Sequence, residues 1–267
     1  MTTRYREHFP PADLRAWVQC LWTMESLVAG PSTHRVLPDG CIDILFVVAG
    51  GRTGEGYVVG MMTRPLLVAR AGASSTVAVR FKPGGAAAFF REPLHRLTDA
   101  RVELPELWPR SGPLHERVAA AAGEAERIEV LVAELRRRLE GARRRGHAGC
   151  KLAIRQLALR PETGVQELCA QLGVSRQGLA KSFREHVGIP PKTLARVLRL
   201  QRALSLLAGP DPGRPWRWSD LALAAGFYDQ SHMVAEWQDL VGLTPSGFLA
   251  ESRGRFPFFQ DSDSTPE

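Results

Sequence analysis

Several features that narrow the function of a protein are missing from this sequence of 267 residues. No apolar run approaches the ~18 residues that a membrane-spanning helix requires. The first ten residues, MTTRYREHFP, lack the hydrophobic core of a signal peptide. The four cysteines show no CxxC spacing, and the seven histidines include no His-x-His pair. We therefore expect a cytoplasmic protein with reduced thiols, no membrane partner, no metal and no cofactor.

The sequence does contain enough apolar residues for a packed core, together with an excess of positive charge. Hydrophobic residues make up 44% of the chain and aromatic residues 7%, which is typical of folded proteins rather than disordered ones. The length allows two domains. The net charge of +7 and the isoelectric point of about 9.7 favour a polyanionic partner without identifying it.

One stretch, residues 165–186, has the pattern of two short helices joined by a tight turn. Apolar residues recur at helical spacing over Val165–Leu172, which predicts an amphipathic helix. Gly173 can end that helix in the left-handed conformation, and Ser175 can cap the next one. The second helix would bury Leu179 and Phe183, which lie four residues apart. This arrangement indicates a helix-turn-helix, with a plain helical hairpin as the alternative.

The same pattern occurs a second time, about fifty residues later. Trp218–Asp239 again predicts a helix, a turn at Gly226 and a second helix capped by Asp229. The core of the two units should then contain Phe227 and Trp237 together with Leu179 and Phe183. An internal duplication is a stronger signal than one helical pair.

A single long helix should join the two units. Similar closing sequences follow them, VGIPP at 187–191 and VGLTP at 241–245. Between these, Pro191–Leu207 has helical periodicity. The apolar pattern assigns five residues to its inner side: Leu194, Val197, Leu198, Arg202 and Leu206.

In order and spacing these motifs resemble the DNA-binding domain of AraC/XylS-family transcription regulators, from about Lys151 to Leu249. The matching motifs are Gly173–Ser175 with Leu179 and Phe183, Arg199–Ala203, Ala225–Phe227, Asp229–His232 and Gly242–Pro245. The resemblance implies two helix-turn-helices held by the linking helix and entering successive major grooves of double-stranded DNA. By family position, the expected DNA contacts are Ser175, Arg176, Gln177, Lys181, Arg184, Lys192, Arg196, Gln230, Ser231 and His232.

The charge of the two units differs. Residues 151–202 contain ten Lys or Arg and three Asp or Glu, whereas residues 203–251 contain two and six. Phosphate neutralisation supplies much of the affinity for DNA, so the first unit should dominate. In the second unit Glu236 should face DNA, where it would repel a phosphate unless it accepts a hydrogen bond from cytosine.

The sequence pattern of the N-terminal half is typical of a β-rich domain. Short apolar runs alternate with Gly and Pro, and we expect strands from Cys20 onward, at Cys41–Val48, and then at 57–62, 65–71 and 76–81. Short helices are expected at 12–18 and 86–90, and a long one at 116–140. Its apolar stripe, which could pair with its copy in a homodimer or pack on its own domain, is Ile128, Leu131, Val132, Leu135 and Leu139.

Three N-terminal motifs, His34–Asp43, Gly60–Pro65 and Val79–Gly85, resemble an uncharacterised domain carried by a branch of the same family. The resemblance implies a cupin-like sensor of a small molecule. Residues that could line its pocket are His34, Arg35, Asp39, Cys41, Asp43, Arg64 and Arg80. The simpler interpretation is that Pro38–Gly40 is a hairpin turn and that Arg80 lies on a solvated face.

The fold class is therefore α+β: a cupin-like, β-rich domain over residues 1–112, a helical connector and basic linker over 113–148, an all-α domain with two helix-turn-helices over 149–252, and a disordered tail over 253–267. We interpret the protein as a sequence-specific regulator rather than an enzyme, with RNA polymerase and an unknown effector as further partners. One alternative is a ligand-independent DNA-binding protein whose N-terminal half serves only assembly. Another is an enzyme that uses Cys20 or Cys41 as a nucleophile, or a metal held by Cys20, His34, Cys41 and Asp43.

Overall fold

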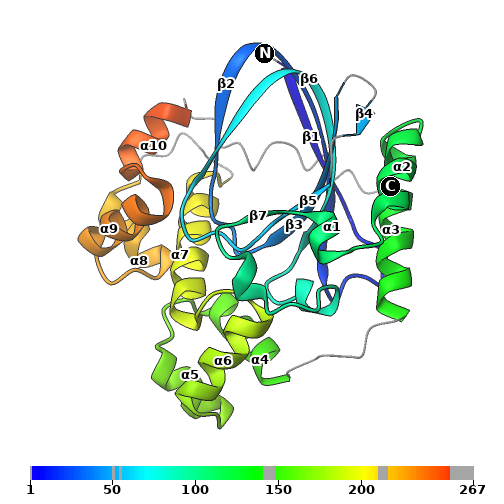
Figure 1. Ribbon diagram of the computed structural model, residues 1–267. Helices are drawn as coiled ribbons and strands as arrows, with labels where there is room; N and C mark the ends of the chain where they lie inside the picture. The colour runs from blue at the N-terminus through cyan, green and yellow to red at the C-terminus, as the bar shows by residue number, and fades with distance from the viewer. Residues whose placement is uncertain (1, 50–51, 54–55, 141–147, 210–215, 253–267) are drawn as a thin grey trace.

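The computed structural model describes residues 2–49, 52–53, 56–140, 148–209 and 216–252. A curved antiparallel sheet lies beside a helical domain, and the helices α2 and α3 pack on the opposite side of the sheet (Figure 1). The sheet order is β1-β2-β6-β3-β5-β7, with β4 paired to β3. In the described part of the chain, no helix is long and apolar enough to cross a membrane. The basic linker at 141–147 and the tail at 253–267 lie outside the described residues.

The expected β-rich N-terminal domain is confirmed, with strands of unequal length. They are β1 (Thr2–His8), β2 (Val18–Val36), β3 (Ile42–Ala49), β4 (Arg52–Thr53), β5 (Tyr57–Val59), β6 (Leu66–Phe81) and β7 (Arg101–Glu103). The separate strands expected at 65–71 and 76–81 form one strand, β6. Gly72 adopts a φ of +73°, so the strand bends there without ending.

The local helices of this half differ from expectation. Of the residues expected as a helix at 12–18, residues 12–17 form turns and Val18 begins β2, and 86–90 contains only the 3₁₀ helix η1 (Ala86–Ala88). A second 3₁₀ helix, η2 (Leu94–Leu97), and the short helix α1 (Leu104–Leu107) follow.

The long helix expected at 116–140 is two helices, α2 (Gly112–Ala120) and α3 (Glu124–Glu140), because Ala121 adopts an extended conformation. The apolar stripe of α3 packs on the core of its own domain: Leu131, Val132 and Leu135 are buried, and Ile128 and Leu139 lie against them. The stripe is therefore occupied within its own chain, as the second interpretation of the sequence required.

The C-terminal half is helical and contains both helix-turn-helices, as expected. Its helices are α4 (Ala148–Leu159), α5 (Val165–Leu172), α6 (Arg176–His186), α7 (Pro191–Leu207), α8 (Trp218–Ala225), α9 (Gln230–Val241) and α10 (Pro245–Ser252). Helices α5 and α6 form the first unit, α8 and α9 the second, and α7 runs between them (Figure 1).

The apolar core continues from one domain into the other. One cluster runs from the sheet into the first unit and includes Leu179 and Phe183, while a second fills the other unit around Phe227 and Trp237. These four side chains are buried, as the duplicated pattern predicts.

The sequence pattern predicted the buried side of α7 only in part. Leu194 and Val197 are buried, but Arg202 is exposed and Arg199 is buried in its place. The polar surroundings of Arg199, described below, account for this difference.

Candidate nucleic-acid interface and buried polar networks

The first recognition helix, α6, is defined at its N-terminus by local chemistry. Gly173 ends α5 with a φ of +64°, a conformation that glycine adopts readily. The Ser175 hydroxyl then accepts a hydrogen bond of 3.0 Å from the backbone N–H of Gly178. The turn and the cap together fix the angle at which α6 leaves α5.

The outer face of α6 carries the expected polar residues. Arg176, Gln177, Lys181 and Arg184 are all exposed, and none of these cations forms an ion pair with another described residue. Lys192, at the start of α7, is exposed as well. Exposed Arg and Lys donors on a capped helix are suited to phosphates and to base edges in the major groove.

Arg196, assigned to DNA by family position, is engaged inside the helical domain. Its guanidinium lies 3.2 Å from Glu236 and 2.7 Å from Asp239, and its side chain is 25% exposed. Two carboxylates already pair with this cation, so a phosphate contact of Arg196 would have to compete with both of them.

The second recognition helix, α9, has a different surface. Asp229 caps it, because its carboxylate accepts a hydrogen bond of 2.7 Å from the His232 N–H. Gln230 and Ser231 are exposed as expected, and Ala235 and Gln238 continue the exposed face. This face of α9 therefore offers hydrogen-bonding groups but no lysine or arginine.

His232 is turned toward the protein instead. Its Nδ1 lies 3.2 Å from the Tyr228 N–H, and its Nε2 lies 3.1 Å from the Glu236 carboxylate. The backbone donor at Nδ1 places the ring proton on Nε2, which then donates to Glu236. A base contact would have to compete with both of these hydrogen bonds.

The expectation that Glu236 faces DNA is wrong. Glu236 is 8% exposed, and Arg199 donates to both of its carboxylate oxygens at 2.9 and 3.0 Å. Arg199 also donates to the Pro161 carbonyl at 2.9 Å, just before the first unit begins. Arg196 and His232 complete the shell of donors around the carboxylate. This buried network joins the first unit, α7 and the second unit.

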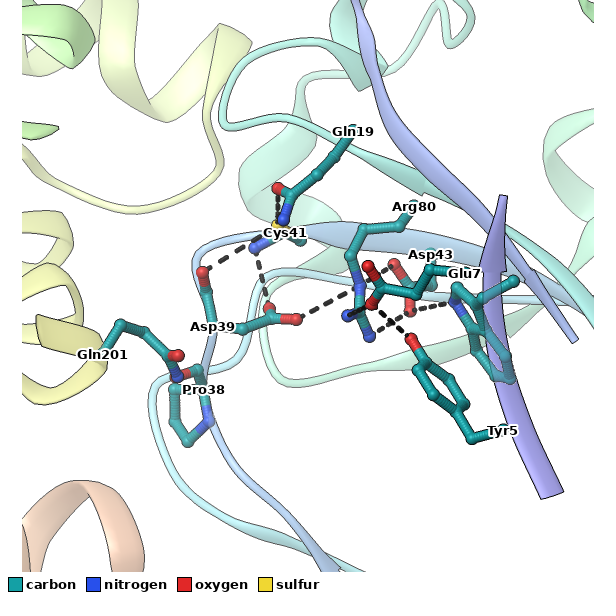
Figure 2. Close-up of polar contacts among 10 residues, drawn as sticks. Tyr5, Glu7, Gln19, Pro38, Asp39, Cys41, Asp43, Arg80 and Gln201 are labelled. Carbon is teal, nitrogen blue, oxygen red and sulfur yellow. Dashed lines mark hydrogen bonds and ion pairs between the residues drawn. The ribbon is translucent and has the colours of Figure 1, made fainter. Parts of the chain in front are cut away.

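The N-terminal sheet contains a second buried polar network, around Arg80 (Figure 2). Arg80 donates to both oxygens of Asp43 at 3.2 and 3.1 Å, and it lies 3.4 Å from Asp39 and 3.9 Å from Glu7. Trp22 adds an N–H bond of 3.2 Å to Asp43. Arg80 is therefore a buried, multiply paired cation, and the expectation of a solvated face is wrong.

The electrostatics of this cluster follow from burial and pairing. Burial raises the pKa of Asp43, although the charge of Arg80 opposes that shift. For Arg80 burial acts to lower the pKa, but attraction to Asp43 and Asp39 outweighs it and raises the pKa well above its usual value. Arg80 therefore stays charged and holds the carboxylates around it.

The remaining candidates from the N-terminal motifs do not all join this cluster. Cys41 does, because its thiol donates to Gln19 at 3.3 Å and its N–H donates to Asp39 at 2.9 Å. Arg35 lies at the boundary between the domains, and Arg64 is exposed. His34 is partly buried on β2, and no group of described residues has the composition of a metal site.

Sequence reasoning missed four residues that connect parts of the molecule: Leu37, Arg199, Gln201 and Glu236. For Arg199 and Glu236 one signal was available. Glu236 and His232 lie four residues apart, and Arg196 and Arg199 lie three apart, so each pair shares a helix face. Nothing in the sequence shows that these two faces meet.

Each half of the chain matches a known family model. Residues 6–103 match a family model described as a domain of unknown function (DUF6597), and residues 168–251 match one described as a helix-turn-helix domain. Comparison with curated proteins gives no match.

Among solved structures, ToxT from Vibrio cholerae is 10% identical over 86% of this chain and 98% of that chain, with a TM-score of 0.44. ToxT of strain SCE256 with bound unsaturated fatty acid is 11% identical over 86% and 94%, with a TM-score of 0.43. A probable AraC family transcriptional regulator from Rhodopseudomonas palustris CGA009 is 30% identical over 38% of this chain and 96% of that chain, with a TM-score of 0.31.

Two capped helix-turn-helices joined by one helix define a DNA-binding protein of the transcription-regulator class. Residues 168–251 belong to this class as a helix-turn-helix domain of the AraC type.

Proposed function

We propose that this AraC-type regulator recognises a specific operator of double-stranded DNA through α6 and α9, and that its N-terminal domain regulates that binding. The exposed face of α6 carries the proposal, since Arg176, Gln177, Lys181 and Arg184 project from a capped helix. Ser175 and Lys192 would contact phosphates beside it. In the second unit, Gln230 and Ser231 would reach the next groove.

The most direct test is selection of duplexes from a random library by the full chain, followed by sequencing. A defined motif is expected, with its best-specified positions under α6. Recovery of sequences no different from the starting library would reject sequence-specific recognition.

Gln177 is the proposed base reader of the first unit, because a Gln amide can donate to and accept from adenine at the same time. Gln177→Ala should relax the preference at one or two base pairs, with a loss of ~1–3 kcal/mol of discrimination. Gln171→Ala is a matched control, because Gln171 is an exposed glutamine on α5 that bonds to Glu167 at 3.0 Å. An unchanged selection profile for Gln177→Ala would remove Gln177 as a reader.

For the N-terminal domain we propose a regulatory role, in which a small-molecule effector acts on the network around Arg80. Four of the seven pocket candidates, Asp39, Cys41, Asp43 and Arg80, come together there. Homodimer formation and contact with RNA polymerase belong to the same proposal. An effector screen by thermal shift, repeated on Arg80→Met, tests it: a compound that stabilises both proteins equally acts elsewhere.

A further inference from the structure

The three N-terminal motifs all reach the helical domain, although they are separate in the sequence. The first contact is made by the turn Leu37–Gly40, which packs on α7. Leu37 is 2% exposed and belongs to the apolar core of the second unit, beside Val197 and Leu200. The Pro38 carbonyl accepts a hydrogen bond of 2.7 Å from Gln201 (Figure 2).

The same turn is packed directly against α7. Gly40 has a φ of +79°, and a β-carbon there would lie 3.4 Å from the Leu194 side chain. On the other side of the turn, Asp39 pairs with Arg80 at 3.4 Å. The turn is thus fixed both to the sheet and to the linking helix.

A second contact holds the end of the second helix-turn-helix. The guanidinium of Arg35 donates to the Val241 carbonyl at 3.1 Å and to both carboxylate oxygens of Glu251 at 3.1 and 3.2 Å. Pro65, from the second motif, lies next to Gly242. The side chain of Arg35 is only 17% exposed, so this contact is partly shielded from solvent.

A third contact holds the end of the first helix-turn-helix. The Thr98 hydroxyl donates to the Gly188 carbonyl at 2.8 Å. A β-carbon on Gly188 would lie 3.5 Å from Met61, which belongs to the second motif. Gly84, from the third motif, faces the Ile154 side chain on α4 so closely that a β-carbon would lie 2.9 Å from it.

The second and third contacts fall on equivalent places in the duplicated domain. Val187–Gly188 and Val241–Gly242 begin the closing sequences VGIPP and VGLTP. The N-terminal domain therefore contacts the same turn in both repeats. Between these two contacts, the turn Leu37–Gly40 packs on α7, the helix that joins the repeats. Three separate points of attachment determine the orientation of one body relative to another.

We propose that the N-terminal domain is an intramolecular clamp that fixes the spacing and orientation of the two recognition helices. Its partner surface is the helical domain of the same chain, and its contact elements are Arg35, the turn Leu37–Gly40 and Thr98. Fixing the helices before binding removes part of the ordering cost of engaging two grooves at once. It also restricts binding to operators whose half-sites have one spacing.

The inference rests on the proposed DNA binding, and Arg35→Ala in the full chain tests it. The probes are the duplex selected by the wild type, the same duplex with one to three base pairs inserted between the half-sites, and a duplex with only the α6 half-site. Arg110→Ala is the matched control, because Arg110 is an exposed arginine in the loop before α2, outside the contacts. Leu37→Ala is the second variant, with Leu27→Ala as its control because Leu27 is 64% exposed on β2, the strand that precedes the turn.

We expect Arg35→Ala and Leu37→Ala to weaken binding to the selected duplex by about tenfold. They should also flatten the dependence on spacing and leave binding to the single half-site unchanged. Spacing profiles that match the wild type would overturn the clamp. Parallel losses on both duplexes would also overturn it, because they would indicate general destabilisation.

A readout without DNA separates this inference from the proposed function. Hydrogen exchange of the amides at 241–244 should accelerate in Arg35→Ala and stay at the wild-type rate in Arg110→Ala. If the wild type selects no sequence and this acceleration is seen, DNA recognition fails while the clamp contact stands. Unchanged exchange at these amides in Arg35→Ala would reject the clamp on its own.

Discussion

The Glu236 carboxylate lies 2.9 Å from the Arg199 guanidinium, and this buried ion pair joins the second recognition helix to the linking helix. The two side chains are only 11% and 10% exposed, and no other carboxylate of a described residue pairs with Arg199. A buried ion pair contributes little net stability compared with apolar residues, but removing one partner is costly. Arg199 also lies over the Phe227 ring, so the pair is part of the packed core.

We expect Glu236→Gln to reduce the free energy of unfolding by ~3–5 kcal/mol, because it leaves two arginines without their buried counter-charge. Asp239→Asn is the matched control, since Asp239 pairs with Arg196 but is 70% exposed. Urea unfolding followed by circular dichroism measures both. Equal midpoints for the two variants would contradict the assignment of Glu236 as a buried hub.

The thiols should be unreactive in the folded protein. Burial is the largest cause that raises the pKa of Cys20 to about 12 and that of Cys150 to about 11, and it raises the pKa of Cys41 well above the usual value. Thiolate is the nucleophilic form, so a disulfide reagent at pH 8 should label these three residues slowly until denaturant is added. Rapid native labelling of Cys20 or Cys41 would revive the thiol-enzyme alternative.

The raised pKa values of these thiols also predict that the protein loses stability at alkaline pH. The folded protein keeps protons on these thiols that the unfolded chain releases near pH 9. Their contribution is fully present below pH 9 and is lost as the pH rises through about 12 for Cys20. A Cys20→Ala variant should show a smaller decline in melting temperature between pH 8 and pH 10 than the wild type.

The apolar stripe on α3 should stabilise its own domain, and the proposed homodimer should form through another surface. Leu135 is 2% exposed against the core of its own domain, so Leu135→Ala should cost ~2–5 kcal/mol of stability. Glu129→Ala, an exposed change on the same helix, should cost little. Sedimentation should give wild-type mass for both variants, and a halved mass for Leu135→Ala would support pairing through this helix.

The features that the sequence predicted well are those with local causes. Gly173 and Gly226 adopt the left-handed conformation, and Ser175 and Asp229 cap the helices that follow them. The turns depend on the missing β-carbon of glycine, and the caps depend on a side chain close to the N–H that it accepts from. Both can be recognised directly in the sequence. The start of α7 was predicted for the same reason, because Pro191 favours the first position of a helix.

The features that it missed depend on contacts between distant segments. Arg199 is buried because Glu236 and Pro161 approach it from other helices, so its own helix pattern could not distinguish it from the exposed Arg202. Leu37 reads as a residue before a hairpin turn, yet it fills the core of the helical domain. The partners of the candidate ligand residues also come from distant segments. Arg80 pairs with Asp39 inside the sheet domain, whereas Arg35 pairs with Glu251 of the helical domain.

The two recognition helices should contribute unequally to affinity, and the structure sharpens the reason. The exposed face of α6 holds Arg176, Lys181 and Arg184, whereas that of α9 holds only uncharged residues up to Gln238. Of the cations that the sequence assigns to the first unit, Arg199 pairs internally with Glu236, and Arg196 pairs with Glu236 and Asp239. The imbalance between the outer faces of α6 and α9 nevertheless persists.

Lys181→Ala should therefore cost more affinity on the selected operator than His232→Ala. It should also reduce the slope of log affinity against log salt by about one unit, because one phosphate contact is lost. His232→Ala removes a donor to Glu236, so its main effect should be a lower melting temperature. Titrations at three or more salt concentrations measure the slopes, with Arg110→Ala as a control that changes neither affinity nor slope. Equal losses of affinity and equal slopes for Lys181→Ala and His232→Ala would contradict the unequal model.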